Sequence, residues 1–465
     1  MSVSSSSSTY TTNHDDDDDD DEDNAREQEE EVFFRQDMRV FLRLRPMNKL
    51  EQSRRSKNCI DLQKDPTIVT IDSPLEGEIL DYRFDHVFEE ESSQEEVFDT
   101  ALPDVAPMVL DGYNCTILAY GQTGTGKTHT MFGVNGEEED GMMLRTVTSI
   151  FQELQQHSND DSYYYTIRVS FIELYLEKIF DLLQPSNTNT TINEEGQLRG
   201  AAELCCLSVA DVRAILARGQ ACRTMSRTQL NTESSKSHAM LRMTITQQPQ
   251  ESNDAATICS TLWMMDLAGS ELANAKRLPR TSTTSPPAAQ LTAMGATTLE
   301  TDSAIPAITT STTTNTPSES VMIHRSLNAL VRMIKVQSSS KQRNQLSTSD
   351  VWKSSKLTRL LRPAFGGNCC TTVLLTASPS SYTISETMST IQFGQYCRQI
   401  QNKPQLQKRR PQQCQNLDYK QLAKRIAQEC LEPTTSNPNR DEALWEIIQE
   451  LANDDDDAEE EAQSK

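Results

Sequence analysis

The sequence predicts an α/β domain built around a mainly parallel sheet and flanked by polar, acidic tails. Three observations predict this arrangement. Short apolar segments with strand character alternate along the chain with helical stretches. One strand, Thr116–Ala119, runs directly into a glycine-rich loop. The surplus of acidic residues is confined to the two ends of the chain.

Six segments have the alternating or continuous apolar pattern of strands. They are Met38–Leu44, Thr116–Ala119, Thr166–Leu174, Ala239–Thr246, Thr261–Met265 and Val373–Ala377. Helical stretches fall between them, at Val209–Arg218 and Ile323–Val336. Strands that are separated by helices join most simply in a parallel sheet, which gives the fold class.

The acidic tails account for most of the net charge. Of the total of −24, residues 15–31 carry −12 and residues 454–465 carry −6, which leaves only −6 for the rest of the 465-residue chain. Hydrophobic residues make up only 36 % of the chain, which indicates that part of it is disordered. Residues 1–36 are the expected disordered part, because they consist of low-complexity Ser/Thr, Asp and Glu runs. A solvated tail is the simplest interpretation of each acidic run. The alternative is a segment that binds a basic partner or weakens docking to an acidic polymer.

The 11 cysteines form neither CxxC pairs nor metal-like Cys/His spacings, so reduced thiols are expected. No apolar run is long enough to span a membrane, and no apolar signal sequence is present near the N-terminus.

Pro279–Ser320 interrupts the α/β pattern with Thr, Ser, Ala and Pro, and indicates a flexible surface insertion from about residue 273 to residue 320. A segment wrongly included in the gene product is the rival explanation. The predicted boundaries are a tail at 1–36, a domain at 37–401, a linker-like segment at 402–417, and short helices with an acidic tail at 418–465.

A complete phosphate-binding loop motif, G-x-x-x-x-G-K-[ST], follows the strand Thr116–Ala119. Its residues are Gly121, Gln122, Thr123, Gly124, Thr125, Gly126, Lys127 and Thr128. The glycines allow backbone N–H groups to surround phosphate oxygens, Lys127 would neutralise the β- and γ-phosphates, and the Thr128 hydroxyl would bind Mg²⁺. A glycine-rich turn with an incidental lysine is the alternative.

Two further segments have the composition needed to hydrolyse a nucleotide. The apolar strand Thr261–Met265 ends in Asp266, which suits an acid that holds the Mg²⁺ shell, and Gly269 would let a backbone N–H reach the γ-phosphate. The stretch Asn231–His238 concentrates hydroxyls, an amide and a cation. By itself, that stretch is also consistent with an ordinary polar loop.

Together these motifs resemble the kinesin motor domain. Residues 111–131, DGYNCTILAYGQTGTGKTHTM, are similar to the kinesin phosphate loop, 231–238 (NTESSKSH) to switch I, and 266–271 (DLAGSE) to switch II. Further matches occur in the same order, at Arg43–Pro46, Phe84–Phe88, Val169–Leu183, Ile323–Leu330, Ser355–Leu361 and Gly366–Asn368. They cover roughly residues 37–401. Residues 228–241 and 418–422 resemble plant-type armadillo-repeat kinesins, although armadillo repeats are absent.

The resemblance implies a P-loop NTPase fold with a twisted, mostly parallel eight-stranded sheet and helices on both faces. It also implies site roles. The expected adenine pocket comprises Arg43, Arg45, Pro46, Tyr113 and His129, although packing alone would also explain His129. The expected Mg²⁺ ligands are Thr128, Ser235 and Asp266. The candidate catalytic residues are Asn231, Ser234, Lys236, Gly269 and Glu271, with Lys236 and Glu271 meeting across the two switches.

The partner that the resemblance implies is the microtubule, which is acidic and therefore needs a basic docking face. Lys341, Arg343, Lys353, Lys356 and Arg359 lie in the corresponding region. Residues 398–410 correspond to the kinesin neck linker, an arrangement usual in motors that move toward the plus end. A cytoplasmic, microtubule-associated protein is expected, without membrane insertion or a nucleic-acid partner. Cargo and oligomeric state stay open.

Several positions depart from the family pattern. Lys236 replaces an Arg and cannot form the two-pronged contact of a guanidinium. Leu272 also replaces an Arg, and Ser354 replaces an Asp. The insertion separates switch II from the helix expected to grip the track. Three hypotheses therefore stand: a motor that hydrolyses ATP when stimulated by microtubules, a module that binds nucleotide and microtubules with little hydrolysis, and an unrelated P-loop NTPase.

Overall fold

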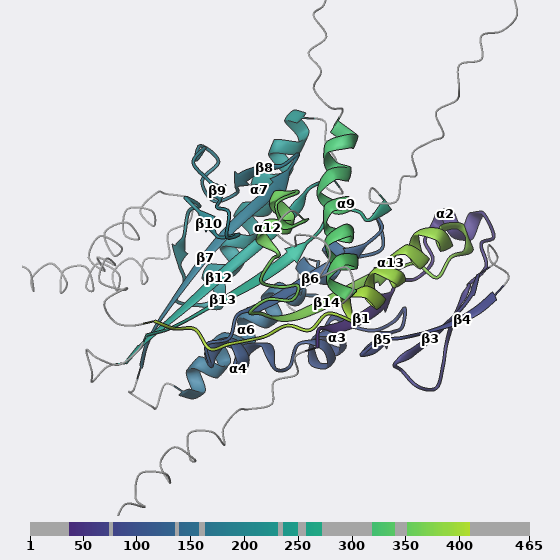
Figure 1. Cartoon of the computed structure of the whole chain (residues 1–465), viewed down its shortest axis with the longest axis horizontal. Coiled ribbons are helices and arrows are strands. Elements are labelled where there is room, and N and C mark those ends of the chain that lie inside the picture. The colour runs from purple at the N-terminus through teal and green to yellow at the C-terminus, as the bar shows by residue number, and fades with distance from the viewer. Residues whose placement is uncertain are drawn as a thin grey trace, which may run out of the picture. The chain divides into compact units, whose positions relative to one another are not determined.

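A central sheet of buried strands forms the middle layer of the domain (Figure 1). Its main path follows the order β11-β7-β12-β13-β6-β14-β1-β5. The bounds are β11 Leu204–Cys205, β7 Tyr163–Tyr175, β12 His238–Pro249, β13 Thr257–Asp266, β6 Cys115–Gly121, β14 Cys370–Ala377, β1 Arg39–Leu44 and β5 His86–Phe88. Two further strands, β8 (Lys178–Asp181) and β15 (Lys408–Arg409), pair with β7 and β13 off this path. The computed structural model describes residues 37–73, 78–134, 139–157, 163–230, 236–249, 257–271, 319–339 and 351–409.

The strands from β13 to β5 run parallel to one another, whereas β12, β7 and β11 pair in antiparallel fashion. Every residue of β6 is buried, as expected for a strand that is covered on both faces. The predicted α/β fold with a mostly parallel sheet is thus confirmed, and the six predicted strand segments lie in strands apart from Met38, which precedes β1.

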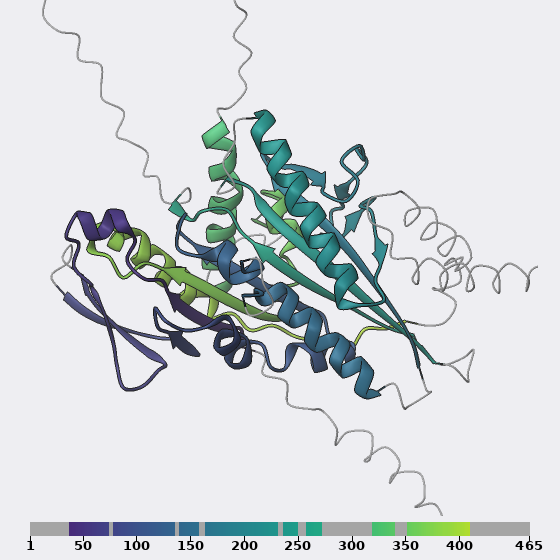
Figure 2. The same cartoon turned by 180° about the vertical axis from the view of Figure 1, so that it is seen from behind.

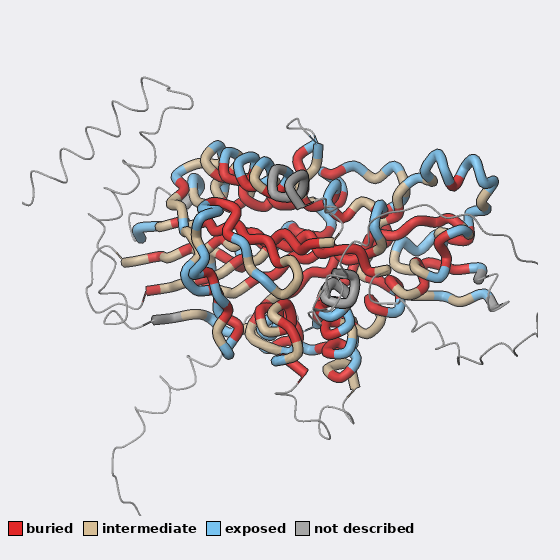
Figure 3. Tube along the Cα trace, turned by 90° about the horizontal axis from the view of Figure 1, so that it is seen from above, coloured by how far each residue is buried: buried red, intermediate tan, exposed pale blue. Residues whose placement is uncertain are grey.

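Helices cover both faces of the sheet. On one face lie α9 (Glu319–Ser338), α12 (Lys356–Leu360) and α13 (Ile384–Cys397), as Figure 1 shows. The opposite face carries α4 (Val105–Leu110), α6 (Met142–His157) and α7 (Val209–Leu230), the last two seen from behind in Figure 2. Buried residues concentrate along the strands and the inner sides of these helices (Figure 3). The site thus rests on a rigid, two-sided core.

Smaller elements surround this core. The strands β2 (Ile60–Leu62), β3 (Ile68–Ser73) and β4 (Glu78–Arg83) form a separate antiparallel sheet, and β9 (Thr191–Ile192) pairs with β10 (Leu198–Arg199). The remaining helices are α2 (Lys49–Ser53), α3 (Gln94–Ala101), α5 (Lys127–Phe132) and a 3-10 turn, η2 (Ser381–Thr383). Capping residues start several of them. In α12, for example, the Ser355 side chain accepts a hydrogen bond from the Thr358 N–H.

Two helices differ from their predicted bounds. The helix predicted over Val209–Arg218 continues to Leu230, and the helix predicted from Ile323 begins at Glu319, inside the end of the predicted insertion. Local sequence preferences are a weak guide to where a helix begins and ends. The predictions for residues 1–36, for most of the insertion, and for the two short C-terminal helices lie outside the described residues.

Residues 401–409 lie along the domain as an extended segment. Asp37 and Gln401 form an antiparallel bridge, the Lys403 N–H donates to the Gly367 carbonyl, and β15 pairs with the start of β13. Asn402 is buried, and its amide donates to the carbonyls of Ala364 and Cys369 at 3.0 and 2.7 Å. The first part of the predicted linker therefore packs against the sheet. No helix in the described part of the chain is long and apolar enough to cross a membrane.

Candidate functional site

The glycine-rich loop joins the end of β6 to the start of α5. Gly124 and Gly126 have φ values of 79° and 105°, which L side chains rarely adopt, so glycine is required at both positions. At Gly121, a Cβ would lie 2.1 Å from the Thr376 carbonyl oxygen. The loop therefore needs its glycines both for backbone conformation and for close approach to β14. It places the backbone of this turn at the N-terminus of α5, where anions are favoured.

Lys127 is buried at the centre of this loop. Its ammonium donates to the carbonyls of Gly121 and Gln122, both at 2.9 Å. Burial lowers the pKa of Lys127, while the negative charges of Asp266 and Glu271 oppose that shift. A cation in this partly dehydrated position interacts strongly with any anion beside it.

Thr128 and Asp266 meet because β6 and β13 are neighbouring parallel strands, so their carboxyl ends lie at the same edge. Asp266 is the register partner of Ala119, and its Oδ2 accepts a hydrogen bond from the Thr128 hydroxyl at 2.8 Å. The other carboxylate oxygen, Oδ1, is buried and accepts no hydrogen bond from any described residue. An orphaned carboxylate oxygen beside a hydroxyl is a donor set that suits Mg²⁺.

This donor set is not a dedicated all-protein metal cage. Among the described residues, no group of three or more His, Cys, Asp or Glu side chains could hold a metal. Magnesium in phosphate sites usually keeps waters and phosphate oxygens as ligands and takes only one or two groups from the protein. The residues present therefore fit a nucleotide-bound Mg²⁺ better than a free structural ion.

Arg223, near the end of α7, connects this edge to the rest of the core and was not predicted from the sequence. Its guanidinium lies 3.5 Å from Asp266 Oδ2, donates to Glu173 Oε1 at 3.1 Å, and donates to the Ser237 carbonyl at 3.1 Å. Arg223 and Glu173 are both nearly fully buried. Because the helix was predicted to end at Arg218, nothing in the sequence indicated that Arg223 would reach Asp266.

Glu271 lies against the phosphate loop. Its carboxylate accepts hydrogen bonds from both the backbone N–H of Thr123, at 2.8 Å, and the Thr123 hydroxyl. A Cβ on Gly269 would lie 2.2 Å from Thr123 Oγ1 and 2.4 Å from Glu271 Oε1, so a larger residue there would displace these side chains. The Ser270 N–H donates to the Gly121 carbonyl. Segment 266–271 is thus physically joined to the loop expected to bind phosphate.

His238 links three elements at this site. Its Nδ1 accepts a hydrogen bond from the Ala268 N–H at 3.0 Å, and its Nε2 lies 3.1 Å from the Ser326 hydroxyl on α9. Because Nδ1 accepts, the ring proton lies on Nε2, which donates to Ser326. Burial lowers the pKa of His238 to about 3, so the ring is neutral at pH 7. The side chain therefore connects β12 and segment 266–271 to α9.

Arg43 and His129 belong to one polar cluster. Arg43 donates to Gln94, Thr130 and the Ser92 carbonyl, and the Gln94 amide donates to the His129 carbonyl at 2.6 Å. Burial lowers the pKa of both Arg43 and His129. These contacts join the Arg43 side chain to Thr130 and, through Gln94, to the backbone of His129 in α5.

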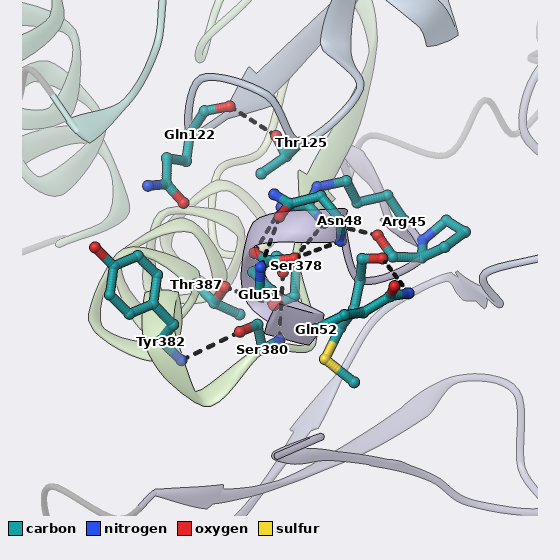
Figure 4. Close-up of polar contacts among 12 residues, drawn as sticks. Arg45, Asn48, Glu51, Gln52, Gln122, Thr125, Ser378, Ser380, Tyr382 and Thr387 are labelled. Carbon is teal, nitrogen blue, oxygen red and sulfur yellow. Dashed lines mark hydrogen bonds and ion pairs between the residues drawn. The ribbon is translucent and has the colours of Figure 1, made fainter. Parts of the chain in front are cut away.

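Arg45 is held by a buried carboxylate (Figure 4). It forms two parallel hydrogen bonds to Glu51, at 2.8 and 2.7 Å, and donates to the Pro46 carbonyl at 2.6 Å. Glu51 also accepts from the Ser378 hydroxyl and the Asn48 N–H. This network fixes the turn after β1 against the loop after β14.

Tyr113 does not lie with the other predicted adenine residues. It precedes β6, whereas Gly121 ends that strand, and a seven-residue strand spans roughly 20 Å. The pKa of Tyr113 is raised by burial and by Asp111 and Cys370, all at the amino end of the sheet. The assignment of Tyr113 to the adenine pocket is therefore wrong. Tyr113 is close to the phosphate-loop motif in sequence, but the length of β6 separates the two in space.

Three predicted residues, Asn231, Ser234 and Ser235, lie outside the described residues. Lys236 is described and half-buried, but its expected contact with Glu271 stays a prediction. Of the predicted basic face, Lys341 and Arg343 are likewise outside the described part of the chain.

The described part of the predicted basic face surrounds α12. Lys353 is exposed, and its ammonium lies 3.9 Å from Glu194. Arg359 donates to the Lys353 carbonyl at 3.3 Å, and the Lys356 N–H donates to Glu177 at 2.7 Å. Glu177 therefore fixes the backbone that presents these cations.

Comparison with known proteins identifies the family. Residues 43–285 and 306–400 match the kinesin motor domain. The interruption between them falls within the predicted insertion. A kinesin heavy chain of Botryotinia fuckeliana is 34 % identical over 372 residues, covering 79 % of this chain and 37 % of the relative. The human kinesin-1 heavy chain is 33 % identical over 371 residues, covering 79 % of this chain and 33 % of that protein.

A solved structure of a fast kinesin shares the fold. It superposes with a TM-score of 0.65 at 31 % identity, covering 80 % of this chain and 94 % of the other. The chain spans about a third of the length of the heavy chains it matches. The match to the family model, together with the geometry of the phosphate loop and segment 266–271, shows that this chain belongs to the kinesin motor domain family.

Proposed function

We propose that this protein is a microtubule-dependent motor that couples ATP binding and hydrolysis to gripping and releasing its track. The solved relative is described in terms of its ATPase mechanism and its interactions with microtubules, which supports the same chemistry here. One observation supports the proposal most directly. The Thr128 hydroxyl donates a hydrogen bond to Asp266 at the edge of the sheet where the Lys127 ammonium is buried.

ATP would bind with its phosphates in the loop Gly121–Thr128, where Lys127 supplies the counter-charge and Gln122, Thr123, Gly124 and Thr125 shape the cradle. Arg43, Arg45, Pro46 and His129 would border the adenine. Thr128, Ser235 and Asp266 would hold Mg²⁺, which when bound neutralises phosphate charge. The orphaned Asp266 Oδ1 favours this assignment.

Hydrolysis would depend on positioning and charge stabilisation. Asn231, Ser234 and the Gly269 N–H would sense the γ-phosphate, while Lys236 and Glu271 would orient the attacking water. The bond between the Thr123 N–H and Glu271 keeps that carboxylate within the loop expected to hold phosphate.

Track binding would use the basic residues Lys341, Arg343, Lys353, Lys356 and Arg359, together with α9. The link from Ala268 through His238 to Ser326 offers a physical route from the nucleotide to that helix. We place the protein on cytoplasmic microtubules, with residues 402–417 acting as a neck linker.

The direct test is the steady-state ATPase rate of the full chain, with and without microtubules, repeated on a chain that lacks residues 273–318. The proposal predicts stimulation by microtubules of at least roughly tenfold, because a partner that speeds a rate-limiting conformational or product-release step raises kcat. An unstimulated rate, with ATP still bound, would reject the motor hypothesis.

A second candidate is a nucleotide-dependent microtubule-binding protein with little hydrolysis. Two observations favour it: the half-buried carboxylate of Glu271 is engaged by Thr123, and Lys236 lacks the two-pronged guanidinium of arginine. Under this candidate, microtubules would co-sediment with the protein in a nucleotide-dependent way while phosphate release stayed near background.

The variant Glu271→Ala tests the role of this carboxylate in the motor hypothesis. If the carboxylate helps to position water, turnover should fall by roughly 100- to 1,000-fold while ATP and microtubule binding persist. The matched control is Glu153→Ala on α6, far along the chain from the site. Turnover that survives in Glu271→Ala would show that this carboxylate is dispensable.

A further inference from the structure

Two cysteines face each other where β6 and β14 begin. Cys115 and Cys370 are register partners in the parallel pairing of these strands, so their side chains lie on the same face of the sheet. Neighbouring strands lie about 4.8 Å apart, which falls within the Cα separation that disulfides require. The backbone therefore already holds the two Cα atoms at a separation that a disulfide can bridge.

The two thiols have different surroundings. Cys115 is only 1 % exposed, whereas Cys370 is partly exposed to solvent. Arg39, on the adjacent strand β1, contributes a positive charge near both sulfurs. An accessible thiol beside a cation, with a second thiol buried behind it, is the arrangement of a reactive cysteine and its resolving partner.

The pKa shifts of the two thiols support these roles of a reactive Cys370 and a resolving Cys115. The hydrogen bond from Cys115, together with the Arg39 charge, lowers the pKa of Cys370 despite its partial burial. The same hydrogen bond and burial raise the pKa of Cys115. By contrast, burial raises the pKa of both Cys206 and Cys369 to about 12, so those thiols stay protonated.

We propose that Cys370 and Cys115 form a thiol oxidation site that hydrogen peroxide converts to a disulfide. The Cys370 thiolate attacks one peroxide oxygen, the O–O bond breaks, and hydroxide leaves, giving a sulfenic acid on Cys370. The Cys115 sulfur then attacks the Cys370 sulfur, the S–O bond breaks, and the departing hydroxide takes the Cys115 proton to form water. Each peroxide molecule oxidises two thiols and yields two waters.

The cysteine pair lies beside the loop that anchors residues 401–409. The Cys369 carbonyl accepts from Asn402, and the Cys370 N–H donates to the Asn114 carbonyl. A disulfide would thus join β6 to the loop that anchors residues 401–409. Gly121 lies at the opposite end of β6, so ATP affinity is expected to survive oxidation. The test therefore does not depend on the proposed function.

The experiment treats the full chain with limiting hydrogen peroxide, blocks the remaining thiols by alkylation, and maps disulfides by tandem mass spectrometry. We expect a linked peptide joining Cys115 to Cys370, removed by dithiothreitol. Cys370 should be oxidised at least roughly tenfold faster than the half-buried Cys205. A Cys370–Cys369 link, or equal oxidation rates of Cys370 and Cys205, would overturn the proposal.

Two variants sharpen the result. In Cys115→Ser the sulfenic acid on Cys370 should persist and be trapped by dimedone, because its resolving thiol is gone. In Cys205→Ser the Cys115–Cys370 link should form as in the unaltered chain. Absence of dimedone adduct on Cys370 in the first variant would contradict the assigned order of steps. Mapping of the unaltered chain decides the proposal even if a variant fails to fold.

Discussion

Lys127 shows most clearly how one residue determines the chemistry of the site. Its ammonium lies among the carbonyls of Gly121 and Gln122, and the acids Asp266 and Glu271 are close enough to affect its pKa. Such a buried cation is costly unless it interacts with negative charge. A bound polyphosphate meets this requirement.

The variant Lys127→Ala should therefore weaken ATP binding by more than about 100-fold, because the phosphates lose a desolvated counter-charge. Titration with a fluorescent ATP analogue measures this. The matched control is Lys178→Ala, which removes an exposed lysine on β8 and should leave the affinity unchanged. Equal affinities in the unaltered chain and in Lys127→Ala would contradict the phosphate-site assignment.

His238 makes a prediction about stability against pH. Burial, together with the charges of Arg223 and Lys127, lowers its pKa to about 3 in the folded state, whereas the unfolded value is near 6.5. As pH falls below about 6.5, the unfolded chain takes up a proton that the folded chain refuses. The contribution of His238 is therefore fully present above that pH and is lost at about 1.4 kcal/mol per pH unit down to about 3.

The measurement is the free energy of unfolding in urea at pH 7 and pH 5.5, for the unaltered chain and for His238→Gln. The unaltered chain should lose about 1 to 2 kcal/mol more over this interval than the variant. Identical pH dependence in the two proteins would show that the ring is protonated, or exposed, in the folded state.

The proximity of candidate site residues could be predicted where a local motif connects them. Lys127, Thr128 and Asp266 come together as expected, because a phosphate loop and the end of a neighbouring parallel strand leave clear local patterns. Arg223 and the role of His238 were missed, because their partners lie on other elements far along the chain. Tyr113 was misassigned, because a strand separates residues that are close in sequence.

At the scale of elements, one buried side chain anchors the extended segment 401–409 in addition to its backbone hydrogen bonds. Asn402 donates to the carbonyls of Ala364 and Cys369 and to the Thr371 hydroxyl, and it accepts from the Gly366 N–H. Its removal leaves the Gly366 N–H and the Cys369 carbonyl without this partner, at about 1 to 3 kcal/mol per buried group, whereas the Ala364 carbonyl still accepts from the Thr371 hydroxyl.

Asn402→Ala should therefore detach this segment without unfolding the sheet. Amide hydrogen exchange at Lys403 and Gln407, whose N–H groups donate to Gly367 and Gly112, should accelerate by roughly tenfold or more. The exposed neighbour Gln405→Ala is the control and should leave exchange unchanged. Unaltered protection in Asn402→Ala would mean that other contacts hold the segment.

The helices α7 and α9 show what a sequence reveals about elements. Their existence and type follow from periodic apolar residues, but both extend past their predicted ends. The pattern located the middle of each helix better than its ends, which local preferences define poorly. In α7, the extra length is what brings Arg223 to Asp266.

At the scale of the whole domain, the sequence predicted the fold class because each level of pattern agreed. Buried strands, interleaved helices and a strand-to-loop motif all favour a mostly parallel sheet with its site at the carboxyl ends of the strands. The connection between Glu271 and α9 could not be predicted in the same way, because its Ser, Thr and Pro residues carry no periodic signal.

The central claim is that the nucleotide sensed by the phosphate loop and segment 266–271 sets how tightly the domain holds a microtubule. The most direct test is the dissociation constant for microtubules, measured by co-sedimentation of the full chain with a non-hydrolysable ATP analogue and with ADP. We predict binding roughly 5- to 150-fold tighter with the analogue, the usual range for coupling between two sites. Equal dissociation constants in the two nucleotide states would contradict the account.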